Sequence, residues 1–163
     1  MTRQSGWKTI ANASYTFLCS ASAVWVLTKY GVFISKVEGP SMFPTFSGRG
    51  DIIIAEAITP TWGTIVVGDV VICTRPVNPR ECIIKRVVAT EGNEVTVFPD
   101  KTHANVRRHR VPAGHVWVQG DNMTHSLDSR QYGPIPLALV RGRVLLQVYP
   151  FVKCIDCSPP RLT

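Results

Sequence analysis

Two kinds of hydrophobic pattern divide the chain. From Thr9 to Thr28 no residue is charged and most side chains are apolar; at the helical rise of about 1.5 Å per residue, such a stretch is long enough to cross a bilayer. After residue 40 the apolar residues fall in short runs rich in β-branched and aromatic side chains, separated by Gly, Pro and Asn. These runs are 51–56, 70–74, 82–90, 94–98, 115–119 and 144–149. The pattern predicts one helix followed by a mainly β domain with coiled antiparallel sheets.

The first apolar stretch is expected to anchor the chain in a membrane. The predicted organisation is a membrane anchor with a short basic flank over 1–29, a β-rich domain over 30–150 and a tail over 151–163. A cleaved signal peptide and a buried core helix are the alternatives. The apolar run continues past the Ala21-Ser22-Ala23 site to Leu27, which favours a retained transmembrane helix. Basic residues flank the stretch at both ends, so the sequence does not fix its orientation.

The amino-acid composition and the distribution of charge indicate which classes of binding partner to expect. The 163 residues are 45% hydrophobic and only 18% charged, which indicates a globular or membrane-attached protein rather than a disordered one. A net charge of +7 would suit nucleic acid or an anionic surface. The arginines are scattered, however, and the one dense run, Arg107-Arg108-His109-Arg110, is interpreted as a solvated loop. We therefore expect no nucleic-acid partner.

The cysteines do not indicate a metal centre. Five cysteines cannot all pair within one chain. Cys154-x-x-Cys157 has the spacing of half a zinc site, but neither a second CxxC nor a histidine pair at zinc-finger spacing accompanies it. We predict that the protein uses no metal and no other cofactor.

Ser41 is the first candidate for chemistry. It lies between Pro40 and Pro44, and proline fixes the backbone φ angle, so the hydroxyl is held on a stiff segment. A rigid frame around a reactive side chain is typical of a preorganised site. An ordinary Pro/Gly/Ser turn has the same composition. A lysine and a polar loop further along the chain decide between the two.

Lys85 is the second candidate. In a strand, Ile83, Lys85 and Val87 lie on one face, and a lysine between branched aliphatic residues loses water. Burial disfavours the ammonium and lowers the pKa, which gives a neutral amine able to act as a general base. The alternative is a buried stem whose head reaches solvent. Arg86 is excluded as a base, because a guanidinium stays protonated.

The loop 120–130 supplies the third set of candidates. It follows a predicted strand and is rich in Gly, Asp, Asn, Ser and Thr. We expect Asp128 and Arg130 to form an ion pair that fixes the loop. Ser126 differs, because its hydroxyl could orient the Lys85 amine as the third member of a nucleophile, base and orienter set.

These segments together resemble the type I signal peptidase family, and within it the mitochondrial inner membrane protease subunits, with the first subunit type favoured. The resemblance covers about residues 30–150, and its ordered motifs are far more specific together than singly. The motifs are Gly39-Pro40-Ser41-Met42-x-Pro44-Thr45, Gly68-Asp69-Val70-Val71, Lys85-Arg86-Val87, Gly120-Asp121-Asn122, Ser126-x-Asp128-Ser129-Arg130 and Tyr132-Gly133-Pro134-Ile135-Pro136.

The resemblance implies a membrane-anchored serine endopeptidase. Ser41 would be the nucleophile and Lys85 the general base of a Ser/Lys dyad, with Ser126, Asp128 and Arg130 at supporting positions. Its substrates would be precursor proteins with extended presequences at the mitochondrial inner membrane. The chain would be single-pass, with its catalytic domain in the intermembrane space and a related protease subunit as partner. Gly39 departs from the pattern, because some bacterial members carry there a serine that serves as an oxyanion donor.

Two other functions remain open from the sequence. A Ser/His/Asp hydrolase could combine Ser41 with His125 and Asp128, although the second glycine of a nucleophile elbow is missing. A non-catalytic, membrane-anchored subunit or scaffold is the other class. Replacing Lys85 should inactivate a Ser/Lys enzyme but not a Ser/His/Asp enzyme. Replacing Ser41 should stop precursor processing by an enzyme but leave it unchanged if the protein is a scaffold.

Overall fold

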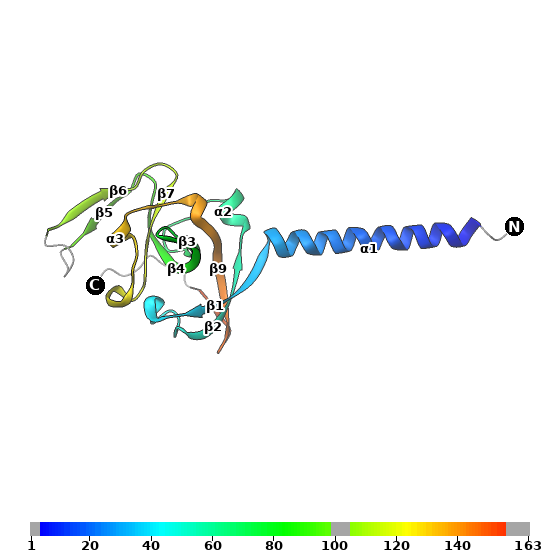
Figure 1. Ribbon diagram of the computed structural model, residues 1–163, viewed down its shortest axis with the longest axis horizontal. Coiled ribbons are helices and arrows are strands. Elements are labelled where there is room, and N and C mark those ends of the chain that lie inside the picture. The colour runs from blue at the N-terminus through cyan, green and yellow to red at the C-terminus, as the bar shows by residue number, and fades with distance from the viewer. Residues whose placement is uncertain (1–3, 99–104, 156–163) are drawn as a thin grey trace.

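The protein, a computed structural model that describes residues 4–98 and 105–155, combines one long helix with antiparallel β-structure (Figure 1). The helices are α1 (Gln4–Tyr30), α2 (Ile58–Trp62) and α3 (Ser129–Tyr132), and the short 3-10 turns are η1 (Pro40–Met42), η2 (Met123–His125) and η3 (Leu137–Leu139). The strands are β1 (Val32–Glu38), β2 (Arg49–Glu56), β3 (Val70–Arg75), β4 (Asn78–Thr90), β5 (Glu94–Val97), β6 (Arg107–Arg110), β7 (His115–Gln119), β8 (Ile135–Pro136), β9 (Val140–Tyr149) and β10 (Lys153–Cys154). The prediction of mainly β structure after an N-terminal helix is confirmed.

The main sheet brings distant parts of the chain together. Its eight strands run in the order β1-β2-β9-β3-β4-β7-β8, with β10 pairing with β9, and every pairing is antiparallel. Alternation buries one face of β2, where Ile53 and Ala55 are fully buried, whereas the central strand β3 is buried on both faces. Separate apolar clusters form under β1, β2 and β9, under β3, β4 and β7, and under the β5–β6 pair. The turn with Ser41 and the loop 120–130 lie beside β4.

The basic run 107–110 is not a loop. It forms β6, which pairs with β5 in a separate two-stranded sheet. The solvated-loop interpretation was wrong because the alternate positions on β5, Val95 and Val97, are buried and give the hairpin an apolar face. His109 lies with its ring centroid 5.1 Å from that of Trp117, so the hairpin packs on the body of the protein.

Helix α1 extends away from the β-rich body, as Figure 1 shows. Its side chains from residue 10 to residue 26 are exposed, so the buried-core alternative is wrong. Within the described part of the chain, no helix combines the length and apolar character that a bilayer crossing requires. The predicted transmembrane span is therefore not supported; polar side chains such as Asn12 and Ser14 interrupt the apolar run.

Candidate active site

Ser41 lies in the middle of the η1 turn between β1 and β2. Gly39, with φ at 90°, opens the turn, and its N–H donates to the Gly48 carbonyl at 3.0 Å. A Cβ on Gly48 would lie 2.0 Å from the Gly39 carbonyl oxygen, so this approach requires glycine. Met42 and Phe46 are each 1% exposed and anchor the segment in the core. The expected stiff backbone around Ser41 thus comes from these anchors as well as from the prolines.

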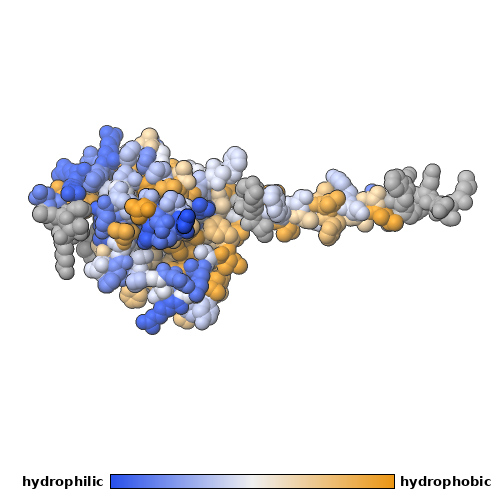
Figure 2. All heavy atoms as spheres, viewed as in Figure 1, coloured by the Kyte–Doolittle hydropathy of each residue, from blue (hydrophilic) through white to orange (hydrophobic). Residues whose placement is uncertain are grey.

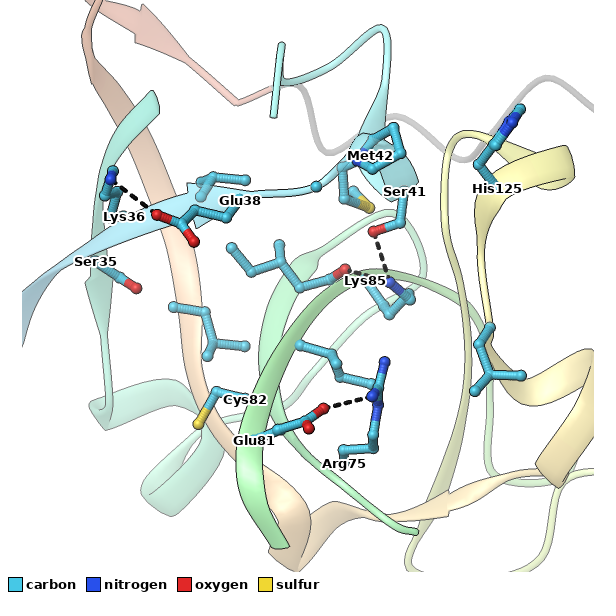
Figure 3. Close-up of a pocket in the computed structure, with 17 residues that line it drawn as sticks. Ser35, Lys36, Glu38, Ser41, Met42, Arg75, Glu81, Cys82, Lys85 and His125 are labelled. Carbon is cyan, nitrogen blue, oxygen red and sulfur yellow. Dashed lines mark hydrogen bonds and ion pairs between the residues drawn. The ribbon is translucent and has the colours of Figure 1, made fainter. Parts of the chain in front are cut away.

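Strand β4 brings Lys85 to Ser41. The Lys85 Nζ donates to the Ser41 Oγ at 2.9 Å and to the Ile84 carbonyl at 3.0 Å (Figure 3). Its neighbours on the same face, Ile83 and Val87, are buried as predicted, and Lys85 itself is 3% exposed. The alternative in which the lysine head reaches solvent is therefore wrong.

The electrostatics of the site favour a neutral lysine. Burial is the largest influence and lowers the pKa of Lys85. The Asp128 carboxylate opposes this shift, and the Arg75 guanidinium reinforces it. The balance remains a lowered pKa, which is the property that a general base needs near neutral pH.

The loop after β7 clamps the backbone of the η1 turn. Asn122 donates from its backbone N–H to the Ser41 carbonyl at 3.0 Å and from its side-chain amide to the Pro40 carbonyl at 3.1 Å. A Cβ on Gly120 would lie 2.5 Å from the Ser41 carbonyl oxygen and 2.3 Å from the Ser126 hydroxyl. Only glycine therefore allows the loop to approach the Ser41 backbone this closely.

Asp128 is the centre of the supporting network. This fully buried carboxylate accepts from the Ser126 hydroxyl at 2.7 Å, from the Gly120 N–H at 3.0 Å and from the Arg130 Nε at 2.9 Å. It also caps α3, with Gln131 completing the capping box. The predicted Asp128–Arg130 ion pair is confirmed.

Ser126 does not make its predicted contact. Across residues 4–98 and 105–155 there is no hydrogen bond between its hydroxyl and Lys85, because the hydroxyl donates to Asp128. Ser126 therefore joins the loop network beside Gly120 rather than holding the amine. The amine is fixed by Ser41 and by the Ile84 carbonyl instead.

A second buried ion pair was not anticipated. Arg86 donates from Nε and Nη2 to the two Asp121 oxygens, both at 2.9 Å, and from Nη1 to the Gly68 carbonyl at 2.9 Å. Thr45 also donates to Asp121. The pair thus joins β4 to the segment after Ser41 and to the loop that clamps it. Both residues lie in motifs named above. They are far apart along the chain, however, so the sequence alone does not predict that they contact each other.

Ser41 and Lys85 open into a cleft of about 580 Å³. One wall is the end of β1 with the η1 turn, another is β3 and β4, and His125 and Leu127 also line the cleft. Arg75 and Glu81 form an ion pair on the β3–β4 wall (Figure 3). The β1 wall is the edge strand of the main sheet, and such an edge can bind an extended peptide.

The His125 triad is not assembled. The His125 ring contacts the Thr124 hydroxyl at 2.8 Å and points away from Ser41 in Figure 3. Asp128 is already bound by Ser126 and Arg130, and within the described ranges His125 has no hydrogen bond to either Ser41 or Asp128. The same part of the chain holds no cluster of three or more His, Cys, Asp or Glu side chains suited to a metal. Cys157 of the CxxC lies outside the described residues.

Comparison with known proteins identifies the family. The model of the signal peptidase family, peptidase S26, matches residues 10–106 and 98–149. The chain belongs to the S26 signal peptidase family. The recognition of signal peptidase motifs in the sequence is thereby confirmed, and the protein is a serine protease of that family.

Its curated relatives are mitochondrial. Mitochondrial ATP-independent inner membrane protease subunit 1a of Arabidopsis thaliana is 40% identical over 82% of this chain and 79% of its own length. Subunit 1 of the mitochondrial inner membrane protease of Schizosaccharomyces pombe is 34% identical over 80% of this chain and 82% of its own length. Subunit 2 from the same organism is 35% identical over 75% of this chain and 67% of its own length. The relatives of this S26 protein thus include both subunit types of the protease.

Proposed function

We propose that this protein is an endopeptidase in which Ser41 is the nucleophile and Lys85 the general base. The observation that carries the proposal is the 2.9 Å contact between the Lys85 Nζ and the Ser41 Oγ, combined with the burial of the lysine. A serine hydroxyl is a weak nucleophile until a neighbouring base removes its proton. Burial keeps a fraction of Lys85 neutral for that purpose.

Acylation uses the Lys85 amine twice. Neutral Lys85 accepts the Ser41 proton as the Oγ attacks the scissile carbonyl carbon, and the ammonium so formed is stabilised by the nearby Asp128 charge. The tetrahedral intermediate collapses when the ammonium donates that proton to the leaving amine. The products of this step are the freed C-terminal segment and an ester on Ser41.

Deacylation repeats the proton transfer with water. Lys85 accepts a proton from the attacking water, and the second tetrahedral intermediate collapses when the lysine returns the proton to the Ser41 Oγ. The backbone N–H of Ser41 makes no hydrogen bond to any residue in the ranges 4–98 and 105–155, so it is available to donate to the oxyanion. Gly39 and Pro40 have no side chain that can add a donor.

The substrates are precursor proteins, cut after an N-terminal presequence that enters the cleft in an extended conformation. The end of β1 is an edge of the main sheet, and edge strands bind extended peptides through main-chain hydrogen bonds. The names of the relatives support the mitochondrial inner membrane as the place of action and a related protease subunit as the partner. The catalytic domain then faces the intermembrane space.

The proposal is tested by precursor processing in mitochondrial membranes that carry the wild type, Ser41→Ala or Lys85→Met, with N-terminal sequencing of the products. We expect both variants to accumulate unprocessed precursor, since loss of a nucleophile or its base costs about 10⁴-fold or more. Processing by Ser41→Ala would indicate a non-catalytic subunit. Processing by Lys85→Met would indicate a different base.

A further inference from the structure

Strand β6 presents an unusual surface. Arg107, Arg108 and Arg110 are all exposed, and Figure 2 shows hydrophilic residues gathered over the β5–β6 hairpin. None of these guanidinium groups forms an ion pair with a residue in the ranges 4–98 and 105–155, even though Glu94 lies opposite Arg110 in the strand register. The positive charge of the hairpin is therefore not neutralised within the described protein.

The hairpin holds these arginines in a fixed geometry. Val95 and Val97 on β5 are buried, and the His109 ring packs against Trp117 in the core. Because side chains alternate along a strand, Arg108 and Arg110 lie on the face opposite His109. Two residues along a strand span about 7 Å, so the side chains of Arg108 and Arg110 leave the same face of β6 at this spacing.

The outer edge of the hairpin is unpaired. Among the described strands β6 pairs with β5 alone, in a sheet of two strands. The backbone N–H and C=O groups along its other edge are thus available to a further strand. The apolar side chains of Phe98 and Val106, 72% and 54% exposed, lie at the same end of the hairpin as Arg107.

We propose that β6 binds an extended acidic segment of a second protein, which adds to the hairpin as a third strand. Acidic residues at alternate positions of that segment repeat at the spacing of Arg108 and Arg110 and face them across the strand pair. Main-chain hydrogen bonds supply affinity, and the arginines select acidic partners and speed association.

A protein fits this surface better than a membrane does. The exposed apolar side chains of the molecule include Phe17, Leu18 and Trp25 of α1, and the hairpin lies at the opposite end of the long axis from α1 (Figure 1). A membrane in contact with α1 would lie far from β6. The alternative role for these arginines is to protect an open strand edge from aggregation. This alternative predicts that no peptide binds, which is one outcome of the test.

The test is binding of synthetic peptides to the full-length, detergent-solubilised protein. The probe is an eight-residue peptide of alternating Glu and Thr with a fluorescent label, and its controls are the Gln/Thr analogue and a Glu/Thr peptide N-methylated at its Thr residues. The variants are Arg108→Glu/Arg110→Glu and, as a matched charge reversal on exposed β10, Lys153→Glu. Vesicles containing anionic lipid are a separate arm.

We expect the Glu/Thr peptide to bind more tightly than either control peptide by about tenfold or more. The double reversal should remove that preference and leave peptide hydrolysis unchanged, whereas Lys153→Glu should retain the preference. Equal binding of the N-methylated peptide would overturn strand addition. Binding to the vesicles alone, or to no probe at all, would overturn the proposal as a whole.

Discussion

Two side chains on different elements carry the proposed chemistry, and their surroundings make them reactive. Ser41 is held by a turn whose neighbours are buried, and Lys85 is held by a strand whose face is apolar. The same burial that disfavours the ammonium also leaves the amine little freedom to move. The network around Asp128 supplies a negative charge that moderates this shift. In the proposed mechanism, the reactivity of the pair is thus a consequence of packing.

The cost of burying Lys85 should be visible in stability. Its pKa falls on folding from an ordinary value of 10.5, so the unfolded chain binds a proton that the native protein releases, and stability decreases as pH falls from about 10.5 to the native pKa. Lys85→Met should therefore raise the free energy of unfolding at neutral pH, by about 1.4 kcal/mol for each pKa unit by which folding lowers the pKa of the lysine, and with it the melting temperature. This gain should vanish as pH approaches 10.5.

The measurement is thermal unfolding across pH, compared with Lys153→Met on exposed β10. The control should show no such gain. A Lys85→Met variant that is less stable than the wild type at neutral pH would indicate that the lysine is charged and well paired in the native protein.

Gly120 permits the contact between the loop and the Ser41 backbone. In Gly120→Ala the new methyl group would meet the Ser41 carbonyl oxygen at 2.5 Å and the Ser126 hydroxyl at 2.3 Å, so the turn must move. We expect kcat/KM to fall about 100-fold or more, because small misplacements of a nucleophile are costly. Peptide hydrolysis assays measure the effect.

Gly92→Ala is the matched control for Gly120→Ala. Gly92 has φ at +82° and open space around its Cβ position, so alanine there should reduce stability by about 1–2 kcal/mol through backbone strain with little effect on activity. Equal loss of activity in the two variants would mean that general destabilisation explains the result.

At the scale of elements, β4 organises the site by sending consecutive side chains to opposite faces. Lys85 faces Ser41, and Arg86 faces Asp121 and the Gly68 carbonyl. One strand therefore sets the position of the proposed base and also fixes the loop that clamps the nucleophile turn. The Arg86–Asp121 pair is nearly buried, with side chains 8% and 11% exposed.

Breaking this pair should loosen the site. Asp121→Ala leaves the Arg86 guanidinium buried without its carboxylate, which costs about 3–5 kcal/mol in comparable cases, and it should reduce peptide hydrolysis at temperatures where the protein remains folded. Lys36→Ala, which removes the exposed Lys36–Glu38 pair, is the control for stability and should leave the melting temperature unchanged. Equal melting temperatures for the two variants would contradict the role given to Asp121.

The sequence predicts those parts of the fold that local pattern controls. The strands β2, β3, β4, β5, β7 and β9 follow from short runs rich in β-branched and aromatic residues, and the inward face of Lys85 follows from alternation. The Asp128–Arg130 pair follows from proximity along the chain. The interpretation of Ser126 is wrong because its hydroxyl donates to Asp128, two residues further along the same loop, and not to Lys85. The interpretation of the run 107–110 is wrong because its partner strand, β5, is a separate element. The Arg86–Asp121 contact was missed for the same reason, since it depends on how β4 and the loop after β7 meet.

At the scale of the whole molecule, the proposed catalytic part and α1 are distinct. Helix α1 meets the body at β1, the strand that follows it along the chain, whereas the site is built from β4, η1 and the loop after β7. Phe17 and Leu18 on α1 are 72% and 64% exposed. Such a surface is suited to an apolar environment or to another protein, and the residues that line the cleft at Ser41 come from other elements.

Charged substitutions on the exposed surface of α1 should change where the protein is found without changing its catalytic rate. The full-length variant Phe17→Lys/Leu18→Lys should leave the membrane fraction of mitochondria more readily than the wild type, yet it should hydrolyse a short peptide in detergent at an unchanged rate. Phe98→Lys, on the exposed end of the hairpin, is the matched control and should stay in the membrane fraction. Loss of peptide hydrolysis in the α1 variant would show that the helix shapes the site.

The proposed mechanism requires a covalent bond between Ser41 and the substrate. Rapid acid quenching of a reaction with a slowly deacylated ester substrate, followed by peptide mass mapping, measures it. We predict an acyl adduct on the peptide that contains Ser41, formed by the wild type and absent from Lys85→Met at neutral pH. Turnover with the adduct on another residue, or an adduct that forms equally fast in Lys85→Met, would contradict the Ser41–Lys85 mechanism.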